Sequence, residues 1–427
     1  MSALVEPTTS SPDQQPSPEY SEPSPISSPS PLSSLLTIII TTSPIRSNPS
    51  LTLLESIIDT FHFAGAEFLL CPRIIVCDGY KKKDDSSGKN LKYANEKSQM
   101  RSGIVDDIQE NNYNLYKARL KERCESDRSD CSLAFYNTSV LELTSRHGYG
   151  FALKAALQEV KSKYVIVIQH DRNFMRPAPV REVVNAMEVD EEVKYVGILM
   201  RSNLMYLEQF VAKYGKAMLQ SLKSCIKRPQ ELRLDPRLFT SKEVAERVFD
   251  DYPRISEKYR NLCENYKKCP PYAELRGEEL SELEGRKGCS DADGDVDGDV
   301  KCQASLIPTL FWYDNVHITR TEHYRDWVFK PERKLVKRGG FVEDKLSPKM
   351  VEDVKSRGFA EGWSPYGCFL VDDHCGVAFT GHMDGGAWMT GDMRVGRMDS
   401  WVKQNGKSPQ EGKDLITPSG NSIIDNC

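Results

Sequence analysis

The sequence predicts an α/β fold in which helices cover both faces of a mostly parallel sheet. Apolar, β-branched runs at 35–42, 73–79 and 164–168 have the composition of buried parallel strands. Segments with helical spacing of apolar residues alternate with strand-like runs from residue 35 to residue 200. The strand–helix–strand order implies right-handed parallel crossovers, so the pattern favours a doubly wound sheet.

Each element follows from its local composition. Ser43-Pro44 ends the first strand, and Ser50 is the expected N-cap of a helix over 51–63, whose apolar residues recur on one side. Gly148 and Gly150 punctuate the start of a helix over 151–160. The other expected elements are helices over 114–124 and 180–187 and strands over 133–136, 140–143, 193–200 and 306–313.

The composition is that of a globular protein without a general affinity for nucleic acid. The chain has 427 residues, 39% of them hydrophobic and 28% charged, with a net charge of −5 and a pI near 5.9. No apolar run approaches the roughly 20 residues that span a bilayer, so we expect no transmembrane segment. The 12 cysteines form no Cys-x-x-Cys pair and residues 1–34 lack a signal-peptide core, so we expect reduced thiols and a cytoplasmic location.

Changes in composition along the chain suggest where its parts begin and end. We expect a disordered Ser/Pro-rich tail over 1–34, a first α/β half over 35–205, a mainly helical insertion with an acidic loop over 206–306, a second half over 307–400 and a polar tail over 401–427. Asp291–Val300 matches the first half of a calcium-binding loop. Because Ala304 stands where such a loop needs its bidentate Glu, we interpret this run as an exposed acidic loop.

The stretch from Arg146 to Pro177 carries the main functional signal. It contains the turn Gly148-Tyr-Gly150-Phe-Ala152, a helix, and an apolar strand that ends in Gln169-His170-Asp171-Arg172. In open α/β sheets, ligands bind at the carboxyl ends of the strands. A carboxylate at this strand end is therefore a functional candidate.

This arrangement resembles the nucleotide-sugar glycosyltransferases of the GT-A fold, especially the family 2 and dolichyl-phosphate-mannose-synthase-like group. Those enzymes carry a G-x-G-x-A turn and helix, then an apolar strand, then Asp-x-Asp. Here Asp171 keeps the second acid of that motif, and Gln169 stands in place of the first. The resemblance implies a GT-A-like, Rossmann-like fold, a nucleotide-diphosphate-sugar donor bound by the 35–205 half, and a divalent metal, Mn2+ or Mg2+, held by Asp171.

The resemblance also implies roles for further residues. Asp78, after the second strand, matches the acid that binds the nucleotide base, although an Asp-Gly turn would need the same residue. His382, with Asp384 nearby, matches a late metal-binding His, although it could equally be a loop residue beside a Gly-Gly hinge. The other expected donor-binding residues are Arg146, Gly148, Gly150, Lys154, Gln169, His170 and Arg172.

The acceptor side of such an enzyme carries an acidic pair, and Glu343-Asp344 matches it in order and in distance from Asp171. The resemblance implies that Asp344 is the general base and that Glu343 orients Asp344 or the acceptor. The alternative is an acid pair that caps the helix expected over 347–356 or faces solvent.

The function implied is transfer of a sugar from the donor to a glycan, lipid or small-molecule acceptor, with inversion. A non-catalytic nucleotide-sugar-binding protein of the same fold is one alternative, favoured by the missing first Asp. A nucleotidyltransferase is another. It would carry a Gly-rich basic loop after the first strand, where this chain has SPIRSNPS without a glycine.

Overall fold

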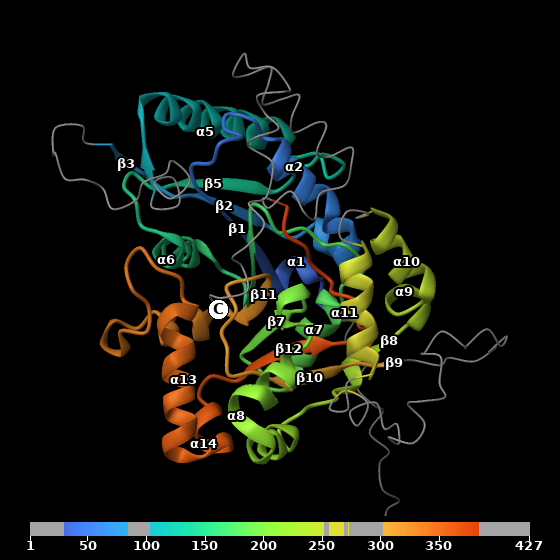
Figure 1. Ribbon diagram of the computed structural model, residues 1–427. Coiled ribbons are helices and arrows are strands. Elements are labelled where there is room, and N and C mark those ends of the chain that lie inside the picture. The colour runs from blue at the N-terminus through green and yellow to red at the C-terminus, as the bar shows by residue number, and fades with distance from the viewer. Residues whose placement is uncertain (1–29, 84–102, 252–255, 269–271, 273–301, 384–427) are drawn as a thin grey trace, which may run out of the picture. The chain divides into compact units, whose positions relative to one another are not determined.

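An eight-stranded sheet forms the centre of the computed structural model, which describes residues 30–83, 103–251, 256–268, 272 and 302–383. The strand order is β10-β12-β7-β11-β6-β1-β2-β5, and Figure 1 shows it running from β5 near the top to β10 near the bottom. The strands are β1 (Leu36–Thr42), β2 (Arg73–Cys77), β5 (Thr138–Glu142), β6 (Tyr164–Gln169), β7 (Tyr195–Ile198), β10 (Ser305–Pro308), β11 (His317–Arg320) and β12 (Cys368–Asp372).

Most neighbouring strands are parallel, as predicted. β6, β1, β2 and β5 pair in parallel, and so do β7 and β12. β11 is antiparallel to both of its neighbours, β6 and β7, and β10 is antiparallel to β12. The two halves of the chain therefore interleave within one sheet, because β11 inserts between two strands of the first half.

Helices cover both faces of the sheet. The steps from β1 to β2 and from β2 to β5 run in one direction across the sheet, and the return from β5 to β6 runs in the other. Right-handed crossovers in opposite directions place their helices on opposite faces. The helices are α1 (Leu32–Leu35), α2 (Thr52–Ile58), α3 (Ala66–Leu69), α5 (Asp107–Asp127), α6 (Tyr149–Glu159), α7 (Val180–Val189), α8 (Tyr206–Lys223), α9 (Pro236–Phe239), α10 (Lys242–Asp251), α11 (Ser256–Lys268), α13 (Glu343–Arg357) and α14 (Phe359–Trp363). The predicted fold class, α/β with a mostly parallel sheet, is confirmed.

Smaller elements complete the described chain. β3 (Lys81–Lys82) pairs with β4 (Ile104–Val105), and β8 (Arg233–Leu234) pairs with β9 (Cys302–Gln303). Short 3₁₀ or π turns span Asp59–Ala64, Arg201–Asn203, Gln230–Leu232, His323–Val328 and Pro331–Arg333. Within the described residues, no helix is both long and apolar enough to cross a membrane.

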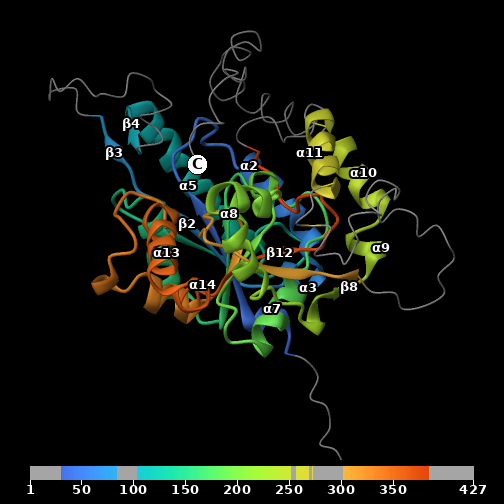
Figure 2. The same cartoon turned by 60° about the horizontal axis from the view of Figure 1, so that its bottom comes forward.

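The described part of the 206–306 segment is mainly helical and packs against the sheet. α10 and α11 lie side by side in both views (Figure 1 and Figure 2). Tyr206 and Tyr266 are buried in the same apolar core as the strands. The hydroxyl of Tyr206 accepts a hydrogen bond from the Leu310 amide at 2.9 Å, and the hydroxyl of Tyr266 lies 2.8 Å from Asp372 at the end of β12. The acidic run 291–300 and the tails over 1–29 and 401–427 lie outside the described residues.

A buried ion pair ties this helical segment to the strand ends. The Arg176 guanidinium binds both carboxylate oxygens of Asp373, at 2.7 and 3.0 Å, and both side chains are 1% exposed. Arg176 also donates to the carbonyl oxygens of Phe239, in α9, and Val377. Such a bidentate pair stabilises the fold only when both partners are present, because either charge alone would be buried without compensation.

We therefore expect Arg176→Met to lower the free energy of unfolding by about 3–5 kcal/mol, because it leaves the Asp373 charge unpaired. Adding Asp373→Asn should restore part of the loss. Chemical denaturation of the two variants measures this, with Arg237→Met, at an exposed position in α9, as the control. If Arg176→Met unfolds at the same denaturant concentration as Arg237→Met, the ion pair does not stabilise the fold.

Candidate active site

Polar side chains from both halves of the chain meet at one edge of the sheet. β1, β2 and β6 are parallel, so their carboxyl ends lie at this edge, and Asp78 and Asp171 follow two of them. β11 is antiparallel to β6, so it begins where β6 ends. Asp314, just before β11, therefore lies beside Gln169, the last residue of β6. This is the edge at which open α/β sheets bind their ligands.

Asp78 holds the glycine turn against the end of β2. Its Oδ1 accepts a hydrogen bond from the His147 amide at 2.8 Å, and its Oδ2 accepts one from the Gly148 amide at 2.9 Å. Arg146 adds a charged contact, with Nη1 3.5 Å from Oδ2. Asp78 is 4% exposed. A carboxylate at this position therefore satisfies two buried backbone donors that would otherwise be costly.

The glycines of this turn are required by a close approach of two loops. Gly148 has φ 75°, and a Cβ on it would lie 2.5 Å from the Cα of Gly339. The Gly339 amide donates to the His147 carbonyl at 3.0 Å, and the Gly150 amide donates to the Gly340 carbonyl at 3.2 Å. The turn that begins α6 is thereby joined to the loop that leads into α13.

Lys154 lies on α6, the helix that begins at the glycine turn. Its ammonium group lies 5.7 Å from the ring centroid of Phe151, on the same helix. No hydrogen bond or ion pair links Lys154 to another predicted site residue within the described chain. Its expected contact with the donor stays a prediction.

The residues that end β6 anchor the strand to its neighbours. The Gln169 amide nitrogen donates to the Asp314 carbonyl at 2.6 Å. The His170 backbone amide donates to the Thr41 carbonyl at 3.0 Å, and its ring Nδ1 lies 3.2 Å from the same oxygen. The polar part of Gln169 is thus used in joining the two halves of the chain.

Asp171 forms a hydrogen-bonded pair with His382. The distance between Asp171 Oδ2 and His382 Nε2 is 2.8 Å, and Asp171 is 8% exposed. Burial opposes the charge on Asp171, yet the hydrogen bond and the charge of His382 hold its pKa well below the usual value. His170 and Arg172 act in the same direction, and Arg172 Nε lies 4.0 Å from Asp171 Oδ1. Asp171 is therefore ionised at neutral pH.

An extended segment carries His382 to this position. The Met175 amide donates to the Phe379 carbonyl at 2.8 Å, and the Met383 amide donates to the Asp171 carbonyl at 2.7 Å. Residues 379–383 thus run antiparallel to residues 171–175, over the end of β6. The expected neighbour of His382, Asp384, lies outside the described residues.

Asp171 and His382 suit a divalent cation as part of a larger ligand set. Asp171 Oδ1 is buried and accepts no hydrogen bond from the described residues, so it has free acceptor capacity. No group of three or more His, Cys, Asp or Glu side chains converges within the described residues. Carboxylate and imidazole both bind Mn2+, and Mg2+ is commonly held by one or two carboxylates with substrate phosphates and water. The residues present therefore fit a cation that is shared with a phosphorylated ligand.

Asp314, which the sequence analysis did not single out, forms a second acidic centre with Glu343. The Glu343 amide donates to Asp314 Oδ2 at 2.9 Å, and the Asp314 amide donates to Glu343 Oε2 at 3.2 Å. Asp314 is 3% exposed, and Glu343 is half-buried at the start of α13. Each carboxyl group thus binds the other residue's backbone, which crosslinks the start of β11 to the start of α13.

The two carboxyl groups cannot both ionise readily. Burial, followed by the charge of Glu343, raises the pKa of Asp314 well above its usual value. Burial also raises the pKa of Glu343, and the charge of Asp344 adds to this, while Arg172 opposes it. The pair therefore keeps a proton at pH values where an ordinary carboxyl group would lose it.

Asp344 occupies a different environment from its neighbour. It is exposed, and its Oδ2 accepts a hydrogen bond from the Phe341 amide at 2.9 Å. This contact ties Asp344 to the loop that leads into α13, and the helix begins at Glu343 rather than near the expected residue 347. Asp344 thus lies on the exposed side of the helix start.

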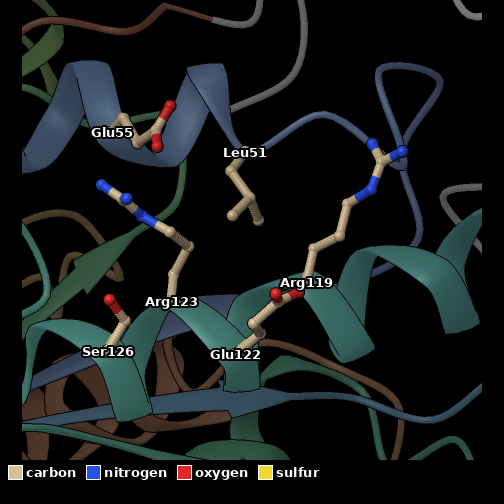
Figure 3. Close-up of a pocket in the computed structure, with 6 residues that line it drawn as sticks. All are labelled: Leu51, Glu55, Arg119, Glu122, Arg123 and Ser126. Atoms are coloured by element: carbon tan, nitrogen blue, oxygen red, sulfur yellow. The ribbon is translucent and has the colours of Figure 1, made fainter.

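A hollow of about 520 Å³ lies away from this edge, between α2 and α5 (Figure 3). Its lining consists of Leu51, Glu55, Arg119, Glu122, Arg123 and Ser126. The charges are mixed, and none of the predicted site residues lies in it. It therefore adds nothing to the candidate active site.

Comparison with known proteins adds distant structural similarities. No family model and no curated protein matches the chain. A mannosyltransferase from Pyrobaculum calidifontis, PcManGT, solved with GDP-Man and Mn2+, is 16% identical with a TM-score of 0.23, over 40% of this chain and 37% of that one. S. aureus TarS is 11% identical with a TM-score of 0.22, over 38% of this chain and 20% of that one. Glucosyl-3-phosphoglycerate synthase from Mycobacterium tuberculosis, solved with Mn2+, UDP and phosphoglyceric acid, is 14% identical with a TM-score of 0.22, over 53% of this chain and 66% of that one.

At these TM-scores the similarities are too slight to assign a function. The chain also spans less than two thirds of each of these structures. Any assignment therefore has to come from the residues at the sheet edge.

We expect Asp78→Asn to destabilise the protein by about 1–3 kcal/mol, because the amide nitrogen of Asn would face one of the two backbone donors that Asp78 now accepts. Thermal unfolding measures this, and Asp326→Asn, at an exposed acid, is the matched control. A variant that melts like the control but binds nucleotides more weakly would show that Asp78 serves the ligand and not the turn.

Proposed function

We propose that this protein is a glycosyltransferase that moves a sugar from a nucleotide-diphosphate donor to a hydroxyl group, with inversion at the sugar carbon. The observation that carries the proposal is the presence of two acidic centres of opposite character at one edge of the sheet. Asp171 is kept ionised beside two histidines and an arginine. The Asp314–Glu343 pair retains a proton. A transfer of this kind needs a charged donor-side centre and a proton acceptor on the other side.

On the donor side, Asp171 and His382 would hold a divalent cation, Mn2+ or Mg2+, which supplies positive charge to the leaving diphosphate. Arg172, whose side chain is 14% exposed beside Asp171, adds a permanent positive charge. As the bond from the sugar carbon to the diphosphate oxygen breaks, its electron pair stays on that oxygen. Positive groups already in place stabilise this charge without reorganisation.

The proposed donor site extends along the glycine turn. Asp78, Arg146, Gly148, Gly150, Gln169, His170 and Lys154 complete the proposed set of donor-binding residues. Asp78 retains acceptor capacity, because a carboxylate offers about four lone-pair sites and two are used by backbone amides.

On the acceptor side, we assign the general base to Glu343 and only a contact with the preceding loop to Asp344. Glu343 is half-buried next to Asp314, and burial raises its pKa toward neutral pH, as a base in water-poor surroundings requires. The acceptor is a hydroxyl of a glycan, a lipid or a small molecule. Its proton passes to the Glu343 carboxylate while its oxygen forms the new bond to the sugar carbon.

A non-catalytic nucleotide-sugar-binding protein is the second candidate function. It is favoured by Gln169, which stands in place of an acid and whose side-chain amide donates to the Asp314 carbonyl.

We also propose a cytoplasmic location, which the free thiols of Cys124 and Cys131 support.

Asp171→Ala should abolish metal-dependent binding of uridine or guanosine diphosphate, because the variant loses the carboxylate on the donor side. Isothermal titration of each nucleotide, with and without Mn2+, measures the effect. Asp326→Ala is the matched control and should bind like the wild type. Gln169→Asp should tighten binding in the presence of Mn2+. Equal affinity of Asp171→Ala and wild type would remove Asp171 from the donor site.

Glu343→Gln should lose about a hundredfold or more in turnover with little change in donor affinity, because a base acts in the transition state. Asp344→Asn should keep its turnover and most of its stability, because the amide oxygen of Asn can still accept the hydrogen bond from the Phe341 amide. Turnover, donor affinity and melting temperature are measured on both variants. A large loss of turnover in Asp344→Asn alone would return the base to Asp344. If neither the wild type nor the variants hydrolyse the donor, the result favours the non-catalytic binding protein.

A further inference from the structure

We propose that Asp314 is a positioning residue: it orients the carboxyl group of Glu343 and keeps one proton shared within the pair. This inference rests on the proposed function where it treats Glu343 as a base. The coupling between the two carboxyl groups is a property of the folded protein and can be measured without any activity.

Two reciprocal hydrogen bonds join Asp314 and Glu343. Asp314 Oδ2 accepts from the Glu343 amide at 2.9 Å, and Glu343 Oε2 accepts from the Asp314 amide at 3.2 Å. Each bond restrains the side chain of one residue by the backbone of the other. The Glu343 carboxyl group therefore loses the rotational freedom that a side chain in the first turn of a helix usually has.

The backbone carbonyl oxygen of Asp314 makes two further hydrogen bonds. It accepts hydrogen bonds from the Gln169 amide group at 2.6 Å and from the Tyr149 hydroxyl at 3.2 Å. Gln169 ends β6, two residues before Asp171, and Tyr149 begins α6 beside the glycine turn. Asp314 thus connects the donor-side strand, the glycine turn and Glu343 through a single residue.

Burial and neighbouring charges decide which of the two carboxyl groups keeps the proton. Glu343 and Asp344 on α13 raise the pKa of Asp314 after burial itself, and Arg172, after β6, opposes burial at Glu343. Tyr149 on α6 is neutral, because burial raises its pKa well above the usual value. Asp314 Oδ1 is buried and has no hydrogen-bond partner among the described residues, which would be costly for a charged oxygen. Arg172 thus favours the negative charge on Glu343, and Asp314 retains the proton.

The sign of the pH dependence follows from this. A carboxyl group with a raised pKa binds its proton in the folded protein at pH values where the unfolded chain has released it. Stability therefore falls as pH rises from the unfolded value toward the raised folded value. In Asp314→Asn the amide is neutral at every pH and its oxygen still accepts from the Glu343 amide, so this fall should be shallower.

The test that needs no activity is a melting series from pH 5 to pH 8.5 on wild type, Asp314→Asn, Glu343→Gln and the double variant. The melting temperature of Asp314→Asn should gain about 2 °C or more on the wild type over this range, and the double variant should not gain the sum of the two single gains. Asp326→Asn, the matched control, should run parallel to the wild type. Parallel curves for Asp314→Asn and wild type would overturn the proposal.

The second arm measures turnover against pH. In Asp314→Asn the acid limb should stay in place, because Asp314 is neutral while it holds the proton and Asn is neutral as well. Asp314→Ala, which cannot bind the Glu343 amide, should lose about tenfold or more in kcat at constant donor affinity, and Asn at this position should restore most of it. A merely structural role would lower the stability of Asp314→Ala without lowering kcat at constant donor affinity. An acid limb that moves to lower pH in Asp314→Asn would show that Asp314 is ionised, and it would overturn the proposal even where Asp314→Ala fails to fold.

The two arms separate the two hypotheses. A wild-type protein without transfer activity removes the proposed function, and the melting series then decides by itself whether Asp314 and Glu343 share a proton. An active wild type whose melting temperatures against pH run parallel to those of Asp314→Asn keeps the function and removes the positioning role.

Discussion

The candidate site depends on the antiparallel pairing of β11 with both β6 and β7. His317, at its start, is paired with Val167 on one side and with Gly197 on the other. Because β11 runs against its neighbours, its first residues lie at the edge where the parallel strands end. This direction brings Asp314 to Gln169, and the loop before α13 to the glycine turn. Without it, the two acidic centres would lie on separate parts of the chain.

The strands that the sequence predicted are those whose signal is local. β1, β2 and β6 are continuous apolar runs, and both faces of such strands are buried, so the pattern is clear without any knowledge of the partners. The same holds for Asp171, which follows one of these runs directly. β11 has only the polar-rich sequence His-Ile-Thr-Arg, yet His317 is fully buried. Its place is decided by pairing with residues more than a hundred positions away, which local composition does not encode.

The choice between Glu343 and Asp344 shows a signal that was present but easily overlooked. Neighbouring residues on a helix point about 100° apart, so only one of an acidic pair can face the core. The buried residues of α13 are Leu346, Ser347, Met350 and Val354, and Glu343 stands three positions before Leu346 and four before Ser347. It therefore shares their face, whereas Asp344 does not. The helix expected over 347–356 does not include Glu343, so the face that Glu343 shares with the buried residues becomes apparent only when the helix begins at residue 343.

The interleaving of the sheet also has a consequence for synthesis of the chain. When the ribosome has made residues 31–205, β6 and β7 exist but the strand that separates them does not. Both would present bare hydrogen-bonding edges of strongly apolar strands until residue 320 emerges, and such edges pair readily with other chains. The nascent first half is thus an aggregation-prone intermediate rather than a domain that can fold and wait. The two edges are covered only after translation has passed through the helical segment that separates them from β11.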